Sequence, residues 1–109
     1  MTQKRKAAPS RSHEAATVES LRKDPQFAAE YLNAVLVDGE QEEVMLALRR
    51  LSQAFGGVST VAKQADLNAT TLYRTLSPKG NPELKSLTAL LRALGMQLVV
   101  RPLPQKRAA

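Results

Sequence analysis

The chain has 109 residues, of which 43% are hydrophobic and only 4% aromatic, and it contains no cysteine. This length suffices for one small domain with a modest core. The absence of cysteine excludes disulfides and thiolate metal sites, and it is typical of a reducing cytoplasm. Because aromatic residues are scarce, the core has to be built from Leu, Val and Ala, which favours an all-α fold over a β-sandwich or barrel.

The sequence also argues against a membrane or secreted protein. No apolar run approaches the roughly 20 residues that are needed to cross a bilayer. The N-terminus is basic, but it lacks the apolar stretch that follows the basic residues in a secretory signal. We therefore expect a cytoplasmic location.

The formal net charge of +6 is distributed unevenly along the chain. Residues 1–23 carry a net charge of +4, residues 24–55 one of −4, and residues 56–109 one of +6. A basic excess of this kind is expected of a protein that binds a polyanion such as DNA. The acidic middle region is either a solvated helix face or a surface for a basic protein.

Residues 1–22 are rich in Lys, Arg, Ser and Ala and show no sustained apolar period, so we expect a disordered basic tail. Such a tail either keeps the protein soluble or reaches phosphates or a minor groove as an arm. The folded domain is then expected over residues 23–102.

Two amphipathic helices are expected next. Asp24 is a good N-cap with Pro25 at the first helical position, and Asp38-Gly39 ends this first helix. A second helix begins near Gln41 and is broken by Gly56 and Gly57. In each helix the apolar residues recur every three or four positions, as a buried helix face requires.

The segment from Val58 to Ser77 has the spacing of a helix-turn-helix, which presents its second helix to the DNA major groove. Ser59 is expected to cap the third helix, and Asn68 the fourth. Asp66 would lie in the corner between them, and the small side chain of Ala62 would allow the two helices to cross closely. An ordinary helical hairpin with a solvated polar face is the alternative.

The expected DNA contacts follow from this geometry. Thr70, Tyr73 and Arg74 share one face of the fourth helix, where an arginine can grip guanine O6/N7 or a phosphate. The N-terminus of the third helix is a natural anion site, and Lys79 and the Gly80 N–H can hold the flanking backbone. The full set of predicted DNA-binding residues is Ser59, Thr60, Lys63, Asn68, Ala69, Thr70, Thr71, Tyr73, Arg74 and Lys79.

After a loop at residues 77–80, Asn81 and Pro82 are expected to begin a fifth helix that ends at Gly95. Residues 96–101 then alternate between two faces, which predicts a short strand. A lone strand would leave backbone groups unpaired, so we expect it to pair antiparallel with a second copy. The alternative is a strand that is frayed or packed on its own domain. The predicted homodimer interface is Met96, Leu98, Val99 and Val100, and residues 103–109 are expected to be a disordered basic tail.

The segment from Val58 to Val99 resembles the lambda-repressor-like (Xre/Cro type) helix-turn-helix domains. The motif EYLNAVL and the stretch GGVSTVAKQADLNATTLYRTLSPKGNPELKSLTALLRALGMQLVV together resemble the HigA-like probable addiction-module antidote proteins, over roughly residues 24–101. The run LYRTLSPKGNP is the most specific part. In the broader helix-turn-helix family, the turn position held here by Asp66 is usually glycine.

This resemblance implies a type II antitoxin that neutralises a small basic toxin similar to the RelE/ParE group and represses its own operon. It therefore implies double-stranded operator DNA, a toxin and a second copy of the chain as partners. Two alternatives remain: a protein-interaction module that chiefly neutralises a toxin, with DNA binding secondary or lost, and a stand-alone phage-type repressor without a toxin partner. A neighbouring reading frame for a small basic protein would favour the antitoxin over the solitary repressor.

No constellation for catalysis is recognisable in the sequence. The single histidine, His13, lies in the predicted tail, and neither a Ser/His/Asp set nor a cluster of metal ligands nor a glycine-rich phosphate loop is found. We therefore expect no enzymatic activity, no cofactor and no metal.

Overall fold

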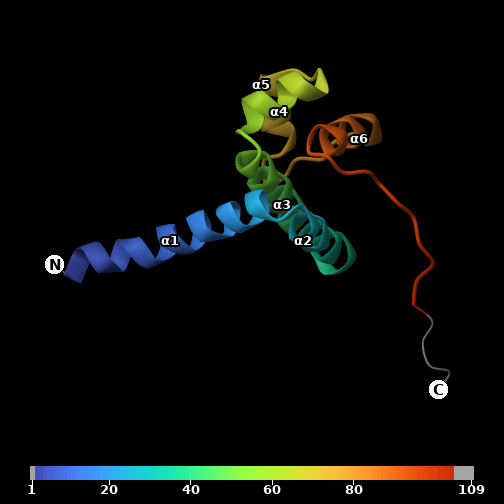
Figure 1. Cartoon of the computed structure of the whole chain (residues 1–109). Coiled ribbons are helices and arrows are strands. Elements are labelled where there is room, and N and C mark those ends of the chain that lie inside the picture. The colour runs from blue at the N-terminus through green and yellow to red at the C-terminus, as the bar shows by residue number, and fades with distance from the viewer. Residues whose placement is uncertain (1, 105–109) are drawn as a thin grey trace.

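A computed structural model of the chain describes the backbone of residues 2–104 and the side chains of residues 13–104. Helix α3 lies at the centre of the fold (Figure 1), in contact with α1, α2 and α4, and α4 in turn contacts α5 and α6. The six helices of the described residues are α1 Thr2–Lys23, α2 Pro25–Asp38, α3 Gln41–Ala54, α4 Val58–Ala65, α5 Ala69–Thr75 and α6 Leu84–Ala93.

The ends of α2 and α3 lie where the sequence predicts them. The N–H of Phe27 donates to Asp24 Oδ1 at 3.1 Å, and the N–H of Gly39 donates to the Val35 carbonyl at 2.7 Å. Helix α3 begins with a capping box, in which the Glu40 N–H donates to Glu43 Oε1 at 2.7 Å. Each cap satisfies a backbone group that the helix itself leaves without a partner.

The prediction of a disordered tail over residues 1–22 is wrong, because Thr2–Lys23 form helix α1. Leu21 is fully buried, Val18 is partly buried against the same core, and α1 contacts both α2 and α3. Large apolar side chains are few in this helix. Val18 lies four residues after Glu14 and Leu21 three residues after Val18, so all three lie on one face of the helix. The folded unit therefore starts before residue 23, and the helix projects from it as an arm (Figure 1).

The prediction of five helices and a C-terminal strand also needs correction, since the described residues form six helices and no strand. Residues 96–104 run away from α6 as an extended segment without ladder partners (Figure 1). The alternating pattern marks the chain as extended, but a strand forms only where a second strand supplies hydrogen bonds. The predicted tail of residues 103–109 falls mostly on residues 105–109, outside the described part of the chain.

One continuous core joins all the helices. It contains Leu21 of α1, Leu48 and Leu51 of α3, and Leu90 of α6, each at most 1% exposed. As predicted from the composition, Leu, Val and Ala make up nearly all of it. This core fixes the orientation of α4 and α5, which carry the candidate site.

Candidate nucleic-acid interface

Helices α4 and α5 pack against each other over small and branched apolar side chains. Val61 and Ala62 of α4 are fully buried, Leu72 of α5 is 3% exposed, and Leu76 just after α5 is fully buried. These side chains form the shared core of the two helices, and Ala62 is the small residue expected at their crossing. A larger side chain at position 62 would force the helices apart, since packed cores tolerate overpacking poorly.

The turn between α4 and α5 is closed by Asp66 in the left-handed conformation, with φ 61° and ψ 42°. The Leu67 N–H donates to the Ala62 carbonyl at 2.8 Å, and the Asp66 N–H donates to the Lys63 carbonyl at 3.2 Å. This is the pair of hydrogen bonds of a Schellman motif, which glycine usually closes. Asp66 therefore makes the turn that glycine makes, because a short polar side chain tolerates this region better than most.

Helix α5 directs its polar face to solvent. Asn68 caps it, as predicted, with Oδ1 accepting the Thr71 N–H at 2.9 Å. Thr70, Tyr73 and Arg74 are exposed on one face, Tyr73 to 56%, and Thr71 is exposed beside them. Ala69 differs from this set, since it is partly buried against the core.

The predicted DNA-binding residues of α4 are exposed as well, but the prediction that Ser59 is the N-cap of this helix is wrong. Gly57, with φ 102°, is the N-cap of α4, and Ser59 is its second residue. Gly57 offers no side-chain oxygen to the first N–H groups, and Ser59, Thr60 and Lys63 all lie on the exposed side of α4. The start of α4 and the polar face of α5 are thus both exposed to solvent.

The loop after α5 is fixed by hydrogen bonds on both sides of Lys79. Ser77 Oγ donates to the Arg74 carbonyl at 2.8 Å, and the Gly80 N–H donates to the Ser77 carbonyl at 2.7 Å. The Gly80 N–H is thus occupied within the loop, contrary to its predicted role toward DNA. Lys79 itself is exposed on this ordered loop.

Two residues of α3 that the sequence reasoning did not single out hold this loop in place. Arg49 donates from Nη1 to the Leu76 carbonyl at the end of α5, and Gln41 Nε2 donates to the Gly80 carbonyl at 3.0 Å. Both contacts join residues far apart in the sequence, so no local pattern reports them. They anchor the end of α5 to the central helix.

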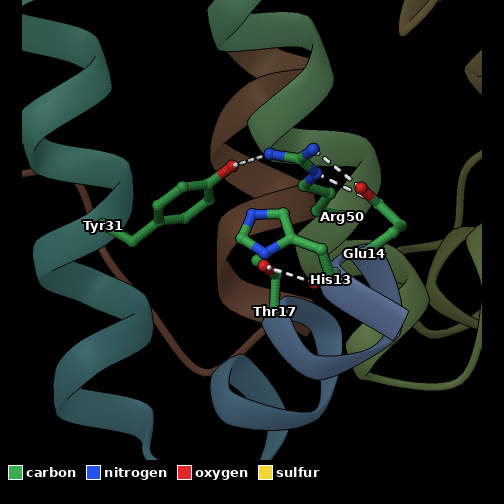
Figure 2. A network of polar contacts seen from close by, with 5 residues as sticks. All are labelled: His13, Glu14, Thr17, Tyr31 and Arg50. Carbon is green, nitrogen blue, oxygen red and sulfur yellow. Dashed lines mark hydrogen bonds and ion pairs between the residues drawn. The ribbon is translucent and has the colours of Figure 1, made fainter. Parts of the chain in front are cut away.

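Helix α1 is held on the same central helix by a polar network (Figure 2). Arg50 of α3 donates to both carboxylate oxygens of Glu14, at 3.0 and 2.7 Å, and to the Tyr31 hydroxyl at 3.2 Å. The hydrogen bonds from Arg50 hold the pKa of Glu14 below its ordinary value, and those to Glu14 and Tyr31 raise the pKa of Arg50. Nearby, Thr17 Oγ1 donates to the His13 carbonyl at 3.0 Å, within α1.

The four predicted dimer residues behave differently from one another. Met96 is partly buried against the core of its own chain, whereas Leu98, Val99 and Val100 are 41%, 61% and 95% exposed. The Met96 N–H donates to the Leu91 carbonyl at 2.8 Å, and Gly95 adopts φ 80°, which ends α6 as predicted. Only the last three residues thus present apolar surface to solvent.

Charge separates the molecule into two surfaces. Every Lys and Arg of residues 56–104 is exposed, namely Lys63, Arg74, Lys79, Lys85, Arg92 and Arg101. The six acidic residues of α2 and its flanks up to the start of α3 are exposed too: Asp24, Glu30, Asp38, Glu40, Glu42 and Glu43. The α4–α5 pair therefore lies in the positive half of the fold.

The fold and this surface define a small all-helical protein with a basic, polar helix pair. A sequence model of the family described as "probable addiction module antidote protein" matches residues 13–102, and the chain belongs to this family. The chain is 31% identical over 71 residues to an uncharacterised protein of Haemophilus influenzae (strain ATCC 51907 / DSM 11121 / KW20 / Rd), covering 65% of this chain and 72% of that protein. No solved structure matches significantly.

Membership of an antidote family implies that the chain has a toxin as a partner, but it does not specify which toxin. Within residues 2–104, no helix is both long and apolar enough to cross a membrane.

Proposed function

We propose that this chain is the antitoxin of a type II toxin–antitoxin module that binds operator DNA and represses its own operon. The α4–α5 pair would act as a lambda-repressor-like helix-turn-helix, with α5 in the major groove. The observation that carries this proposal is the exposed face of Thr70, Tyr73 and Arg74, displayed by a helix whose opposite side is buried. No catalytic role is part of the proposal.

The residues of this surface divide into two kinds of contact. Arg74 and Thr70 would read base edges, where an arginine fork discriminates guanine. Tyr73, Thr71, Lys63 and Lys79 would contact phosphates, which position the protein without reading sequence. Asn68 acts by capping α5, since its Oδ1 is already an acceptor for Thr71.

The protein would bind DNA as a homodimer. Leu98, Val99 and Val100 expose apolar surface on the extended C-terminal segment, and burial against a second copy would remove it from water. Two recognition helices would then reach half-sites about one helical turn, roughly 34–36 Å, or a multiple apart.

The toxin would be a small basic protein of the RelE/ParE kind. Family membership supports a toxin in general, and the acidic residues 24–55, with a net charge of −4, support a basic one. Cotranscription with a small basic reading frame separates this proposal from a stand-alone repressor.

The test is a gel shift on the promoter upstream of the gene, with the purified chain and variants. Arg74→Ala should weaken operator binding about 10- to 100-fold while binding to random DNA changes less. Arg92→Ala, which changes an exposed arginine of α6 outside the predicted DNA-binding set, is the matched control and should bind like the wild type. If binding to operator and to random DNA weakens equally, Arg74 contacts phosphate rather than a base. If binding is unchanged, α5 does not lie in the DNA interface.

The toxin half of the proposal needs a separate measurement. The chain and the product of the adjacent gene are co-expressed, and complex formation and growth rescue are scored. We expect a stable complex and rescue of growth. If the chain binds the operator but neither forms a complex nor rescues growth, it is a stand-alone repressor.

A further inference from the structure

Helix α2 has an outer face that carries apolar side chains. Phe27, Glu30, Ala34 and Val37 follow one another at intervals of three, four and three residues, so they lie on the same side of the helix. Phe27 is 41% and Val37 76% exposed, whereas Ala28 and Leu32 on the opposite side are buried. The contacts of α2 with α1 and α3 thus leave this face open.

Carboxylates lie within this apolar face and beyond the end of α2 that carries Val37. Glu30 lies within it, Asp38 ends α2, and Glu40, Glu42 and Glu43 follow in the turn and at the start of α3. No Lys or Arg occurs between residues 24 and 48, so no cation of this stretch offsets them. An exposed aromatic and an exposed valine on a helix that also carries carboxylates suit a partner with both apolar and cationic groups.

We propose that this surface docks a basic protein, which is the toxin if the proposed function holds. We define the α2 surface as Phe27, Glu30, Ala34 and Val37 together with Asp38, Glu40, Glu42 and Glu43. The inference rests on the proposed function for the identity of the partner, while the position of the surface comes from exposure and charge. Phe27 and Val37 are its apolar anchors, and the carboxylates select cationic partners.

The same charges argue against the two other occupants. DNA would bring phosphates against exposed carboxylates, which is repulsive. A second copy related by a two-fold axis would place this acidic surface against itself, which like charges oppose. A protein rich in Lys and Arg meets neither difficulty.

The part of the α2 surface on helix α2 itself is separated from the candidate DNA surface by the central helix, whereas Glu40, Glu42 and Glu43 flank Gln41, whose side chain donates to the Gly80 carbonyl beside Lys79. Helix α2 contacts α1 and α3 but none of α4, α5 and α6. Variants on helix α2 itself, such as those at Phe27 and Val37, should therefore leave operator binding intact. This independence makes the two surfaces separable by experiment.

The test uses the full chain and the purified small basic protein encoded beside its gene, titrated by calorimetry at low and high salt. Val37→Lys should weaken the complex at least about tenfold, since it removes an apolar anchor and repels a cationic partner. Glu42→Lys should weaken it several-fold and flatten its salt dependence. Both positions are exposed, so both variants should fold with the circular dichroism of the wild type, and Val37→Lys should also leave the operator gel shift unchanged.

Leu84→Lys is the matched control, because Leu84 of α6 is 70% exposed, close to the 76% of Val37. It should bind the basic protein like the wild type. If the wild-type chain forms a complex that neither α2 variant weakens, the docking surface is overturned while the antitoxin proposal stands. If the wild-type chain forms no complex, the toxin half of the proposed function fails. A Val37→Lys variant that loses only self-association would make α2 a contact between copies and overturn the inference.

Discussion

The α2–α3 region and the α4–α6 region share one apolar core but differ in almost everything that faces solvent. Residues 24–55 carry a net charge of −4 and residues 56–109 one of +6. Exposed ion pairs add little to stability, and like charges gathered on one surface repel. Stability alone therefore does not explain the separation, which fits two partners of opposite charge.

The two regions also differ in how their backbones are held. Helices α2 and α3 begin with side-chain caps, Asp24 in one and the Glu40/Glu43 pair in the other. In the α4–α6 region α5 alone begins with a side-chain cap, from Asn68, and the turns depend on Asp66 in the left-handed conformation and on Gly80, where a Cβ would meet the Thr75 carbonyl. The candidate DNA surface is thus built from short helices whose turns fix their directions.

The largest expected effect concerns helix α1. Leu21→Ala should lower the free energy of unfolding by about 3 kcal/mol, because a fully buried leucine leaves a cavity. Denaturant unfolding followed by circular dichroism measures it. Ser20→Ala, at the exposed neighbouring position, is the control and should stay within about 0.5 kcal/mol of the wild type.

This prediction decides whether α1 belongs to the α2–α3 region. A disordered tail would make Leu21→Ala as neutral as Ser20→Ala. The basic N-terminal residues would then lie on a tether rather than on a docked helix.

The next effect tests the α4–α6 region at its loop. A Cβ built on Gly80 would lie 1.6 Å from the Thr75 carbonyl oxygen, so Gly80→Ala has to displace backbone. We expect a loss of about 2 kcal/mol in unfolding free energy, with weaker operator binding as Lys79 moves. Asn81→Ala, exposed beside it, is the control. Equal midpoints for the two variants would show that the loop adapts without cost.

The sequence predicts the helices best where a local signal marks an end. Asp24, Gly39, Asn68 and Gly95 all act where the pattern places them. Asp66 stands where the broader family usually has glycine, and it adopts the left-handed conformation that glycine would. Its tolerance depends on the hydrogen bonds of the whole turn, which a single residue type does not report.

The errors at α1 and at residues 96–101 share a physical cause, which is dependence on distant residues. Helix α1 looks disordered in isolation, because Glu14 gains its partner Arg50 only through a contact 36 residues away. The pattern of residues 96–101 indicates an extended chain, but a strand needs a neighbour that the single chain does not supply. For the candidate site, local spacing located the exposed face of α5, whereas the supports from Arg49 and Gln41 are long-range.

The smallest expected effect concerns the link between α1 and α3. Arg50 holds the pKa of Glu14 below 4.5, so the native state binds this proton more weakly than the unfolded chain. The stabilisation is therefore fully present above about pH 4.5 and disappears as the pH falls through the lowered native pKa. Because the Glu14 side chain is 48% exposed, Glu14→Gln should cost only about 0.5 kcal/mol at pH 7.

Unfolding of wild type and Glu14→Gln at neutral pH and near pH 3 measures this difference, which should shrink at acid pH. Glu30→Gln is the matched control, since Glu30 accepts its hydrogen bond from the neutral Gln26 rather than from a cation. Amide exchange in residues 13–23 should become faster in Glu14→Gln but not in Glu30→Gln, because only the first variant loses the carboxylate to which Arg50 donates. If amide exchange in α1 is unchanged while Leu21→Ala is strongly destabilising, then apolar packing alone holds α1 against α2 and α3.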